Sequence, residues 1–219
     1  MNADSDQLIP ENLRVAAASD ILDSLGHRDR AMASRLRPLD PLTCRFHGRA
    51  RTWQWMDCDF IPEDDPYGLQ IEAVDLLRPG DVVVHSTLHR GSTAVWGELL
   101  STAAIARGAR GIVCDGLIRD CAQILELGLP VFHCGIKPVD NAGRARLAAI
   151  DIPIKCGEVL VNPGDLVFAD LDGVVVLPRS AEEHVVELAL KKLASEQVAI
   201  NQLAEGESLR DVCTRTGVL

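Results

Sequence analysis

The stretch GELLSTAAIARGARGIVCDGLIRD, residues 97–120, decides how this chain folds. Its first half opens on a glycine and carries apolar residues at helical spacing. GIVCDG (111–116) then predicts a short buried strand, and RDCAQILELG (119–128) predicts a short helix that ends at Gly128. LPVFHCG (129–135) predicts the next strand. Strands and helices that alternate with tight turns are typical of an α/β fold.

The same alternation continues toward the N-terminus. Residues 11–26 predict a helix that stops at Gly26, and residues 48–56 predict a strand. Residues 69–77 predict a short helix, which leads through the RPGD turn into VVVHS (82–86), a buried strand. The helix of the central stretch is expected within residues 93–111.

Beyond residue 150 the pattern changes to strands joined by turns. Residues 152–178 predict three strands, with NPGD and DLDG as the turns. Residues 179–206 predict a long amphipathic helix, with Ser180 as N-cap and Glu183 completing a capping box. The tail, 207–219, is expected to pack on a surface. The chain shows no repeat and no linker, so we expect one compact domain over residues 1–219.

Composition and charge narrow the possible partners. Of 219 residues, 47% are hydrophobic and only 4% aromatic, which argues against a base-stacking surface for single-stranded nucleic acid. The net charge is −10, and the most basic segment, residues 27–37, is interrupted by Asp29. Phosphate backbones would be repelled, so we expect no nucleic-acid binding. A basic protein partner or a small anion remains open.

The cysteines and the N-terminus indicate a cytoplasmic protein. The cysteine count is seven, an odd number, and no CxxC occurs, so free thiols in a reducing compartment are expected. The first residues lack the basic and apolar regions of a signal peptide. No apolar stretch reaches 18 residues, so no membrane span is expected.

The first candidate site is the helix start at residues 97–100. Backbone N–H groups at a helix N-terminus have no partner in the helix and lie at the positive end of its dipole. After Gly97, the amides of Leu99 and Leu100 are therefore candidate donors to an anion. The alternative is an ordinary glycine turn before an alanine-rich helix.

The second candidate site is the pair Arg119 and Asp120, which follows a predicted strand. A guanidinium group matches the geometry of a carboxylate, and Asp supplies the oxygen ligand that magnesium prefers. The alternative is a solvated ion pair that caps a helix. Both candidate sites follow strands, where open α/β sheets place their ligands.

Other polar residues are weaker candidates. His85 and His89 are four residues apart, but they lie on a predicted strand and loop and would not share a helical face, so metal binding there is a minor alternative. His133 and Cys134 are expected in the core, and Asp170 and Asp172 in a turn. No GxGxxG, P-loop, GxSxG or HExxH motif occurs, which excludes the corresponding nucleotide, hydrolase and zincin sites.

The chain resembles the RraA-like family, which includes the 4-hydroxy-4-methyl-2-oxoglutarate and 4-carboxy-4-hydroxy-2-oxoadipate (HMG/CHA) aldolases. The resemblance rests on an acidic residue, twenty intervening positions and an Arg-Asp pair, here Glu98 and Arg119-Asp120. It extends to SDILDSLG near the N-terminus, GRARTW (48–53) and residues 162–178. Characterised aldolases of the group often carry Asp where this chain has Glu98, which adds one methylene at that position.

The resemblance implies a ββα swivelling-type α/β domain that assembles as a homotrimer or homohexamer. It implies that Asp120 binds a divalent metal, Mg²⁺ or Mn²⁺, largely through waters. Arg119 would hold the 2-oxo acid, and the amides of Leu99 and Leu100 would receive its carboxylate. Glu196, from the long helix of a neighbouring subunit, would orient a water at the metal.

Two functions follow from the resemblance. The first is a class II lyase that cleaves 4-hydroxy-2-oxo acids to pyruvate and a second 2-oxo acid, and that decarboxylates oxaloacetate through the same pyruvate enolate. The alternative is a non-catalytic regulator that binds and inhibits a ribonuclease, as the namesake of the family does. The presence of Glu98 together with Arg119 and Asp120 favours the enzyme, because an inhibitor has no need of them.

Overall fold

The computed structural model describes residues 9–61, 65–88 and 93–218. Its helices are α1 (Val15–Ser24), α2 (Leu69–Asp75), α3 (Glu98–Ala106), α4 (Cys121–Leu127), α5 (Glu182–Ala204) and α6 (Leu209–Thr216). Its strands are β1 (Arg37–Pro38), β2 (Phe46–Asp57), β3 (Asp81–Ser86), β4 (Ala94–Trp96), β5 (Gly111–Ile118), β6 (Val131–Ile136), β7 (Ala145–Ile150), β8 (Ile154–Cys156), β9 (Val159–Val161), β10 (Leu166–Asp170) and β11 (Gly173–Leu177).

Most strands form one mixed sheet in the order β1-β6-β5-β3-β2-β10-β11. Strands β2, β3, β5 and β6 are mutually parallel along this order, and β4 adds a further parallel pairing with β5. The other pairings, of β1 with β6, β2 with β7 and β10, and β10 with β11, are antiparallel. The carboxyl ends of β4, β5 and β6 therefore meet at one edge, where α/β sheets bind ligands.

The parallel strands are buried on both faces, because their side chains alternate between two hydrophobic clusters. On β3, Val82 and Val84 pack into a cluster with the β8–β9 hairpin, whereas Val83 packs into a cluster with helices α2 and α3. On β5, Val113 joins the first cluster and Ile112 the second. This two-sided burial explains why these strands read as continuous apolar runs in the sequence.

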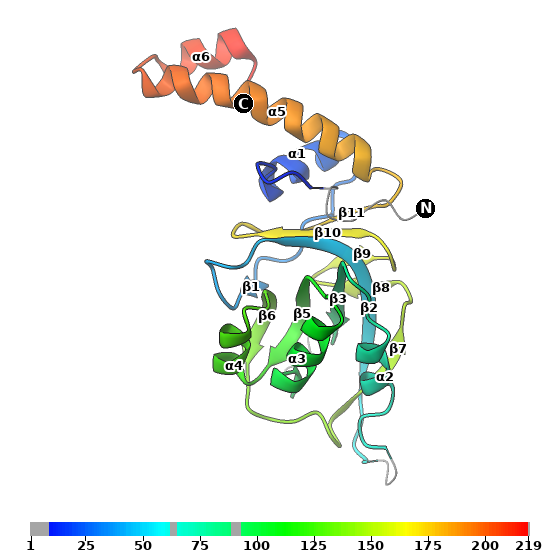
Figure 1. Cartoon of the computed structure of the whole chain (residues 1–219). Coiled ribbons are helices and arrows are strands. Elements are labelled where there is room, and N and C mark those ends of the chain that lie inside the picture. The colour runs from blue at the N-terminus through cyan, green and yellow to red at the C-terminus, as the bar shows by residue number, and fades with distance from the viewer. Residues whose placement is uncertain (1–8, 62–64, 89–92, 219) are drawn as a thin grey trace.

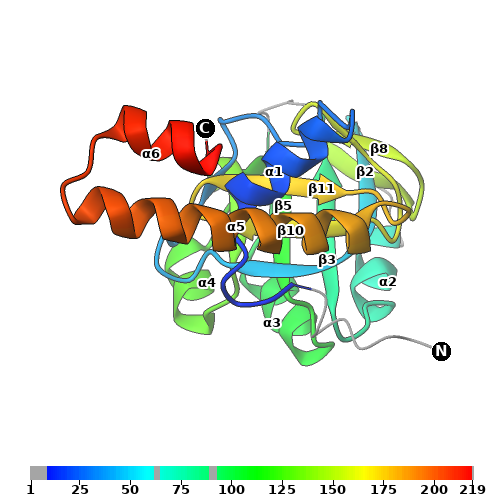
Figure 2. The same cartoon turned by 90° about the horizontal axis from the view of Figure 1, so that it is seen from above.

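A third layer covers β10 and β11. Helices α1 and α5 lie on the far side of these strands from α2, α3 and α4 (Figure 1). Leu22 of α1 and Val185 of α5 meet Phe168 of β10 in a third hydrophobic cluster. Seen from above, α5 runs across β10 and β11 and continues with α6 beyond the sheet (Figure 2).

The α/β fold class predicted from the sequence is confirmed, and several boundaries are corrected. Residues 94–96 form β4 rather than the start of a helix, and 145–150 form a strand, β7, that was not predicted. The capping box is wrong: α5 has Ala181 as its N-cap, and no side chain caps it. The tail forms a helix, α6, whose N-cap Ser208 accepts a hydrogen bond from the amide of Asp211.

Two other predictions concern cysteines and membranes. All seven cysteines are free, as expected. Among the helices that the structure describes, none combines the length and the apolar composition required to cross a membrane.

Candidate functional site

Gly97 and Asp120 bring the two predicted sites together. Gly97 follows β4 and is the N-cap of α3, and Asp120 lies just after β5 and is the N-cap of α4. A Cβ atom at Gly97 would lie 2.5 Å from Asp120 Oδ2 and 3.2 Å from Arg119 Cγ. Because real Cβ contacts do not come this close, only glycine allows the Asp120 carboxylate to occupy its place.

The backbone of Asp120 directs its carboxylate to the start of α3. Its dihedral angles, φ 56° and ψ 39°, are left-handed, a conformation that Asp tolerates better than most residues. Asp120 Oδ2 accepts a hydrogen bond of 3.2 Å from the amide of Glu98. The carboxylate therefore lies at the positive end of α3 instead of capping its own helix.

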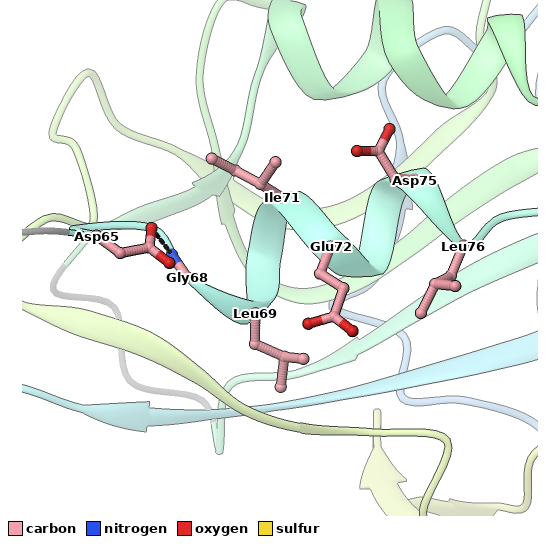
Figure 3. Close-up of a pocket in the computed structure, with 7 residues that line it drawn as sticks. All are labelled: Asp65, Gly68, Leu69, Ile71, Glu72, Asp75 and Leu76. Carbon is pink, nitrogen blue, oxygen red and sulfur yellow. Dashed lines mark hydrogen bonds between the residues drawn. The ribbon is translucent and has the colours of Figure 1, made fainter.

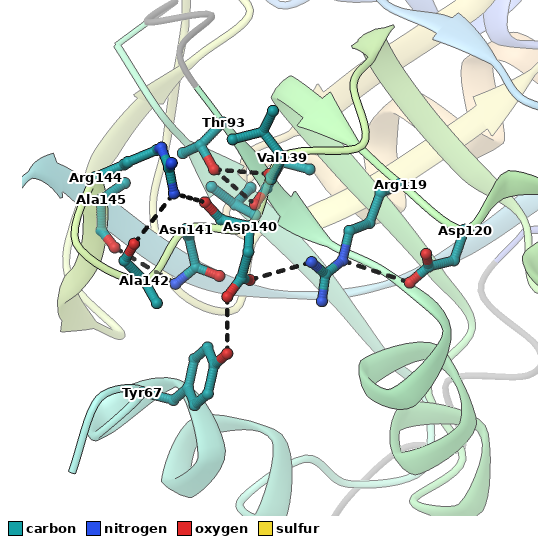
Figure 4. A network of polar contacts seen from close by, with 12 residues as sticks. Tyr67, Thr93, Arg119, Asp120, Val139, Asp140, Asn141, Ala142, Arg144 and Ala145 are labelled. Atoms are coloured by element: carbon teal, nitrogen blue, oxygen red, sulfur yellow. Dashed lines mark hydrogen bonds and ion pairs between the residues drawn. The ribbon is translucent and has the colours of Figure 1, made fainter. Parts of the chain in front are cut away.

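Arg119 lies between two carboxylates. Its amide donates to the carbonyl of Trp96 at 2.9 Å, which fixes its backbone to the end of β4. Its Nε lies 3.5 Å from Asp120 Oδ2, and its Nη1 lies 3.3 Å from Asp140 Oδ1. Figure 4 shows the guanidinium group between these two side chains, with its third nitrogen pointing away from both.

Two buried hydrogen bonds hold the start of α3. Trp96 Nε1 donates to Ser101 Oγ at 2.8 Å, and Ser101 Oγ donates to the carbonyl of Gly97 at 2.9 Å. Trp96 and Ser101 are both buried, so these hydrogen bonds are shielded from water. The amides of Leu99 and Leu100 belong to the first helical turn, whose N–H groups have no partner within the helix. Two buried hydrogen bonds thus tie the start of α3 to the end of β4.

His85 lies in an aromatic cluster rather than at a metal site. Its Nδ1 accepts a hydrogen bond of 2.9 Å from Trp55 Nε1, and its ring meets those of Trp53 and Trp96 edge-on. Complete burial lowers the pKa of His85 to about 3, so the ring is neutral. The minor alternative of metal binding by His85 is therefore not favoured, and His89 lies outside the described residues.

Glu196 lies far from these residues within one chain. It forms an ion pair of 3.0 Å with Lys192 and borders a hollow that Asn12 and Arg14 also line. Its helix, α5, is on the opposite side of β10 and β11 from α3 and α4 (Figure 1). A role for Glu196 at the site therefore requires a second subunit, as the resemblance implies.

The carboxylates at this edge suit a hydrated cation. The side chain of Asp120 is 39% exposed, and in the described part of the chain its Oδ1 accepts no hydrogen bond. Glu98 is exposed beside it. Residues 9–61, 65–88 and 93–218 contain no group of three or more His, Cys, Asp or Glu that would cage a metal. Magnesium needs no such cage, because it keeps several waters and binds through one or two carboxylates.

A second hollow lies along α2 and is distinct from the Arg119 site. It is lined by Asp65, Gly68, Leu69, Ile71, Glu72, Asp75 and Leu76 (Figure 3). Within it, Asp65 Oδ1 accepts a hydrogen bond from the amide of Gly68, and Asp75 pairs with Arg107. Its lining carries acidic and apolar side chains but no basic one, so it is a poor place for an anionic acid.

Comparison with known proteins finds relatives that match most of the chain. The family model described as RraA-like, Aldolase/RraA, matches residues 15–176. The chain belongs to the RraA-like family. A relative from Halalkalibacterium halodurans, named "Putative 4-hydroxy-4-methyl-2-oxoglutarate aldolase", is 32% identical over 179 residues, which are 82% of this chain and 79% of the relative.

Solved RraA-like structures share the fold. Streptomyces coelicolor RraAS2, described as an unusual member of the RNase ES inhibitor RraA protein family, is 33% identical, with a TM-score of 0.79 over 91% of this chain and 98% of its own. The RNA-processing inhibitor RraA from Thermus thermophilis is 25% identical, with a TM-score of 0.59 over 73% of this chain and 92% of its own. The family thus contains proteins named as aldolases and proteins named as inhibitors.

The sequence did not indicate Asp140 and Tyr67. Tyr67 Oη donates a hydrogen bond of 2.8 Å to Asp140 Oδ2, which continues the chain of contacts from Arg119 (Figure 4). The two residues are 73 positions apart and lie in irregular segments, so no spacing rule connects them. Only the tertiary fold brings them to the site.

Proposed function

We propose that this RraA-like chain is a divalent-metal-dependent carbon–carbon lyase that cleaves 4-hydroxy-2-oxo acids and releases pyruvate. The observation that supports it is the meeting of Arg119 and Asp120 with the N-terminus of α3 at one edge of the sheet. Positive groups and a cation ligand converge there, as an oxo acid requires. The relative named as an aldolase points to the same chemistry.

Each group has a role set by its charge. The amides of Leu99 and Leu100 donate hydrogen bonds to the C1 carboxylate of the substrate, and Arg119 faces the 2-oxo oxygen. Asp120, with Glu98 nearby, would hold Mg²⁺ or Mn²⁺, which supplies Lewis-acid polarisation of the 2-oxo group. When the C3–C4 bond breaks, its electron pair forms the pyruvate enolate, and Arg119 stabilises the negative charge that develops on the oxygen.

The aldol cleavage also requires loss of the 4-hydroxyl proton. We assign this proton to the carboxylate of Glu98, which is exposed at the start of α3 beside Asp120. Decarboxylation of oxaloacetate gives the same enolate without this step. Glu98→Gln is therefore expected to reduce aldol cleavage about a hundredfold while oxaloacetate decarboxylation changes much less. Equal losses in both reactions would contradict the assignment.

The direct test is pyruvate release, coupled to lactate dehydrogenase, from 4-hydroxy-4-methyl-2-oxoglutarate and from oxaloacetate. We expect turnover with Mg²⁺, none with EDTA, and a loss of about a thousandfold in Asp120→Ala. A control, Asp172→Ala, removes an exposed turn carboxylate and is expected to keep full activity. Absence of turnover in folded, magnesium-loaded protein would rule out the proposed lyase for these substrates.

The second candidate is a regulator that docks on a ribonuclease. The similarity to RraAS2 and to the Thermus thermophilis inhibitor favours it, and the net charge of −10 suits a basic partner surface. An inhibition assay with an RNA-degrading endonuclease separates the two functions. Inhibition that Asp120→Ala leaves intact, without pyruvate release by the wild type, would favour the regulator.

A further inference from the structure

The guanidinium group of Arg119 is held at two of its three nitrogens. Nε faces Asp120 Oδ2 at 3.5 Å, and Nη1 faces Asp140 Oδ1 at 3.3 Å. In the part of the chain that the structure describes, Nη2 has no hydrogen bond or ion pair. These two ion pairs restrict the guanidinium group, and Nη2 lies on the side away from both carboxylates (Figure 4).

Hydrogen bonds of the residues before and after Asp140 fix its position in the loop. Before it, the carbonyl of Val139 accepts hydrogen bonds from the amide of Ala94 at 2.8 Å and from Thr93 Oγ1 at 2.9 Å. After it, buried Asn141 donates to the side chain of Gln70 at 3.1 Å. The loop that carries Asp140 is thus pinned to β4 and α2, and the carboxylate between these anchors is preorganised (Figure 4).

Tyr67 orients the same carboxylate. Its hydroxyl donates to Asp140 Oδ2 at 2.8 Å, which leaves Oδ1 for Arg119. This hydrogen bond raises the pKa of Tyr67, as expected for a phenol beside a carboxylate. The three residues come from three separate segments and form one line of contacts, Tyr67–Asp140–Arg119.

We propose that Asp140 is a positioning residue, which holds the guanidinium of Arg119 so that Nη2 faces the 2-oxo acid, and that Tyr67 supports it. The inference rests on the proposed function for its ligand. Asp120 is shared between Arg119, the amide of Glu98 and the cation it would bind, so it cannot also fix Arg119 throughout the reaction. Asp140 contacts neither the amide of Glu98 nor the proposed cation position, so it can hold Arg119 throughout the reaction.

The test compares Asp140→Ala with Asp140→Asn. Oxalate, a planar mimic of the pyruvate enolate, is titrated by calorimetry into the magnesium-loaded protein, and kcat and KM are measured for oxaloacetate. Asp140→Ala is expected to weaken oxalate binding and to lower kcat/KM about tenfold. Asp140→Asn is expected to lose less than Asp140→Ala, because its amide oxygen can still lie beside Arg119 Nη1 although the charge of the ion pair is gone. Tyr67→Phe is expected to cost about two- to threefold.

A double-mutant cycle separates positioning from general stability. In an Arg119→Ala background, Asp140→Ala is expected to have no further effect on oxalate affinity, because the group it positions is gone. Asp75→Ala is the matched control: it removes an aspartate from an ion pair with Arg107 on neighbouring helices and is expected to leave oxalate affinity unchanged. An equal effect of Asp140→Ala in both backgrounds would overturn the proposal, as would wild-type affinity in Asp140→Ala.

Crystal structures of the wild type and Asp140→Ala test the positioning without reference to activity. We expect the Arg119 side chain to leave its place in the variant, and an unmoved guanidinium would overturn the inference. A wild-type protein that neither binds oxalate nor releases pyruvate would refute the proposed function instead. The two failures are therefore distinguishable.

Discussion

Gly97 is required for contact distance rather than for backbone conformation. Its φ of −162° and ψ of −167° are extended and open to any residue, but a Cβ would collide with Asp120 Oδ2. Gly97→Ala is therefore expected to displace that carboxylate. Because displacements of about 1 Å cost catalysts on the order of a hundredfold, we expect pyruvate release to fall by that amount.

The control for this substitution is Gly26→Ala. Gly26 has a φ of 85°, and a Cβ there meets nothing within 4 Å. The change is expected to lower the melting temperature, because of the left-handed conformation, without lowering pyruvate release. If Gly97→Ala behaved in the same way, the close approach to Asp120 would have no role in the reaction.

His85 makes the stability of the fold depend on pH. Burial lowers its pKa from 6.5 to about 3, so below pH 6.5 the unfolded chain binds a proton that the folded chain does not. The free energy of unfolding should therefore fall as the pH drops from 6.5 toward 3, by up to about 1.4 kcal/mol per pH unit. Burial lowers the pKa of His133 as well and acts in the same direction.

The measurement is denaturant unfolding at pH 7, 6 and 5 for the wild type and for His85→Gln. The glutamine oxygen can still accept from Trp55 Nε1 but cannot take up a proton. We expect a shallower loss of stability with falling pH in the variant. An unchanged slope would assign the proton uptake to other groups.

At the scale of elements, the sequence predicts strands and helices where one hydrophobic period dominates. VVVHS and GIVCDG are short apolar runs between turn residues, and they form β3 and β5. The sequence predicts a helix for residues 94–96, because the helical pattern of α3 follows without a break. Pairing with β5 makes them a strand instead. RARLAAI, which supplies β7, has no clear period, and only its pairing with β2 decides its structure.

The helix caps likewise depend on both the local sequence motif and the tertiary contacts. Ser180 and Glu183 match a capping box, yet α5 begins after Ala181 without a side-chain cap. Ser208 and Asp211 have the same spacing and do cap α6. A local motif therefore places a helix start only when the preceding turn allows it, and the turn depends on tertiary contacts.

The outer layer of helices is expected to stabilise the fold without affecting the reaction. Leu22 of α1 is fully buried against α5 and β10, and α1 lies on the other side of β10 and β11 from α3 and α4 (Figure 1). Leu22→Ala should lower the free energy of unfolding by about 2–5 kcal/mol. Leu25→Ala, at a residue 38% exposed, should cost less than about 1 kcal/mol. Denaturant unfolding measures both, and a loss of kcat in folded Leu22→Ala would contradict this separation.

At the scale of the whole molecule, the prediction for Glu196 concerns assembly. Within one chain Glu196 is separated from Asp120 by the sheet, so it acts only if subunits share sites, as the predicted trimer or hexamer would allow. Glu196→Ala and Asp120→Ala are each expected to lose activity, and mixed oligomers of the two to regain part of it. A mixture that stays inactive after subunit exchange would exclude a shared site.

The candidate site was predictable only in part. Arg119, Asp120 and the start of α3 lie within one stretch of sequence, and their spacing in that stretch carries the family signal. Asp140 and Tyr67 contact Arg119 through a loop and a segment before α2, and nothing local in either segment marks them. Contacts between distant irregular segments have no periodicity, so they depend on the fold alone.

The aromatic cluster around His85 makes the intrinsic tryptophan fluorescence of the protein a local signal. All three tryptophans of the chain, Trp53, Trp55 and Trp96, surround His85, and Trp96 directly precedes Gly97. Fluorescence excited at the red edge of indole absorption therefore comes from this region alone. We expect a ligand that binds at the first turn of α3 to alter the emission of Trp96, so that stopped-flow fluorescence follows binding and release without an added dye.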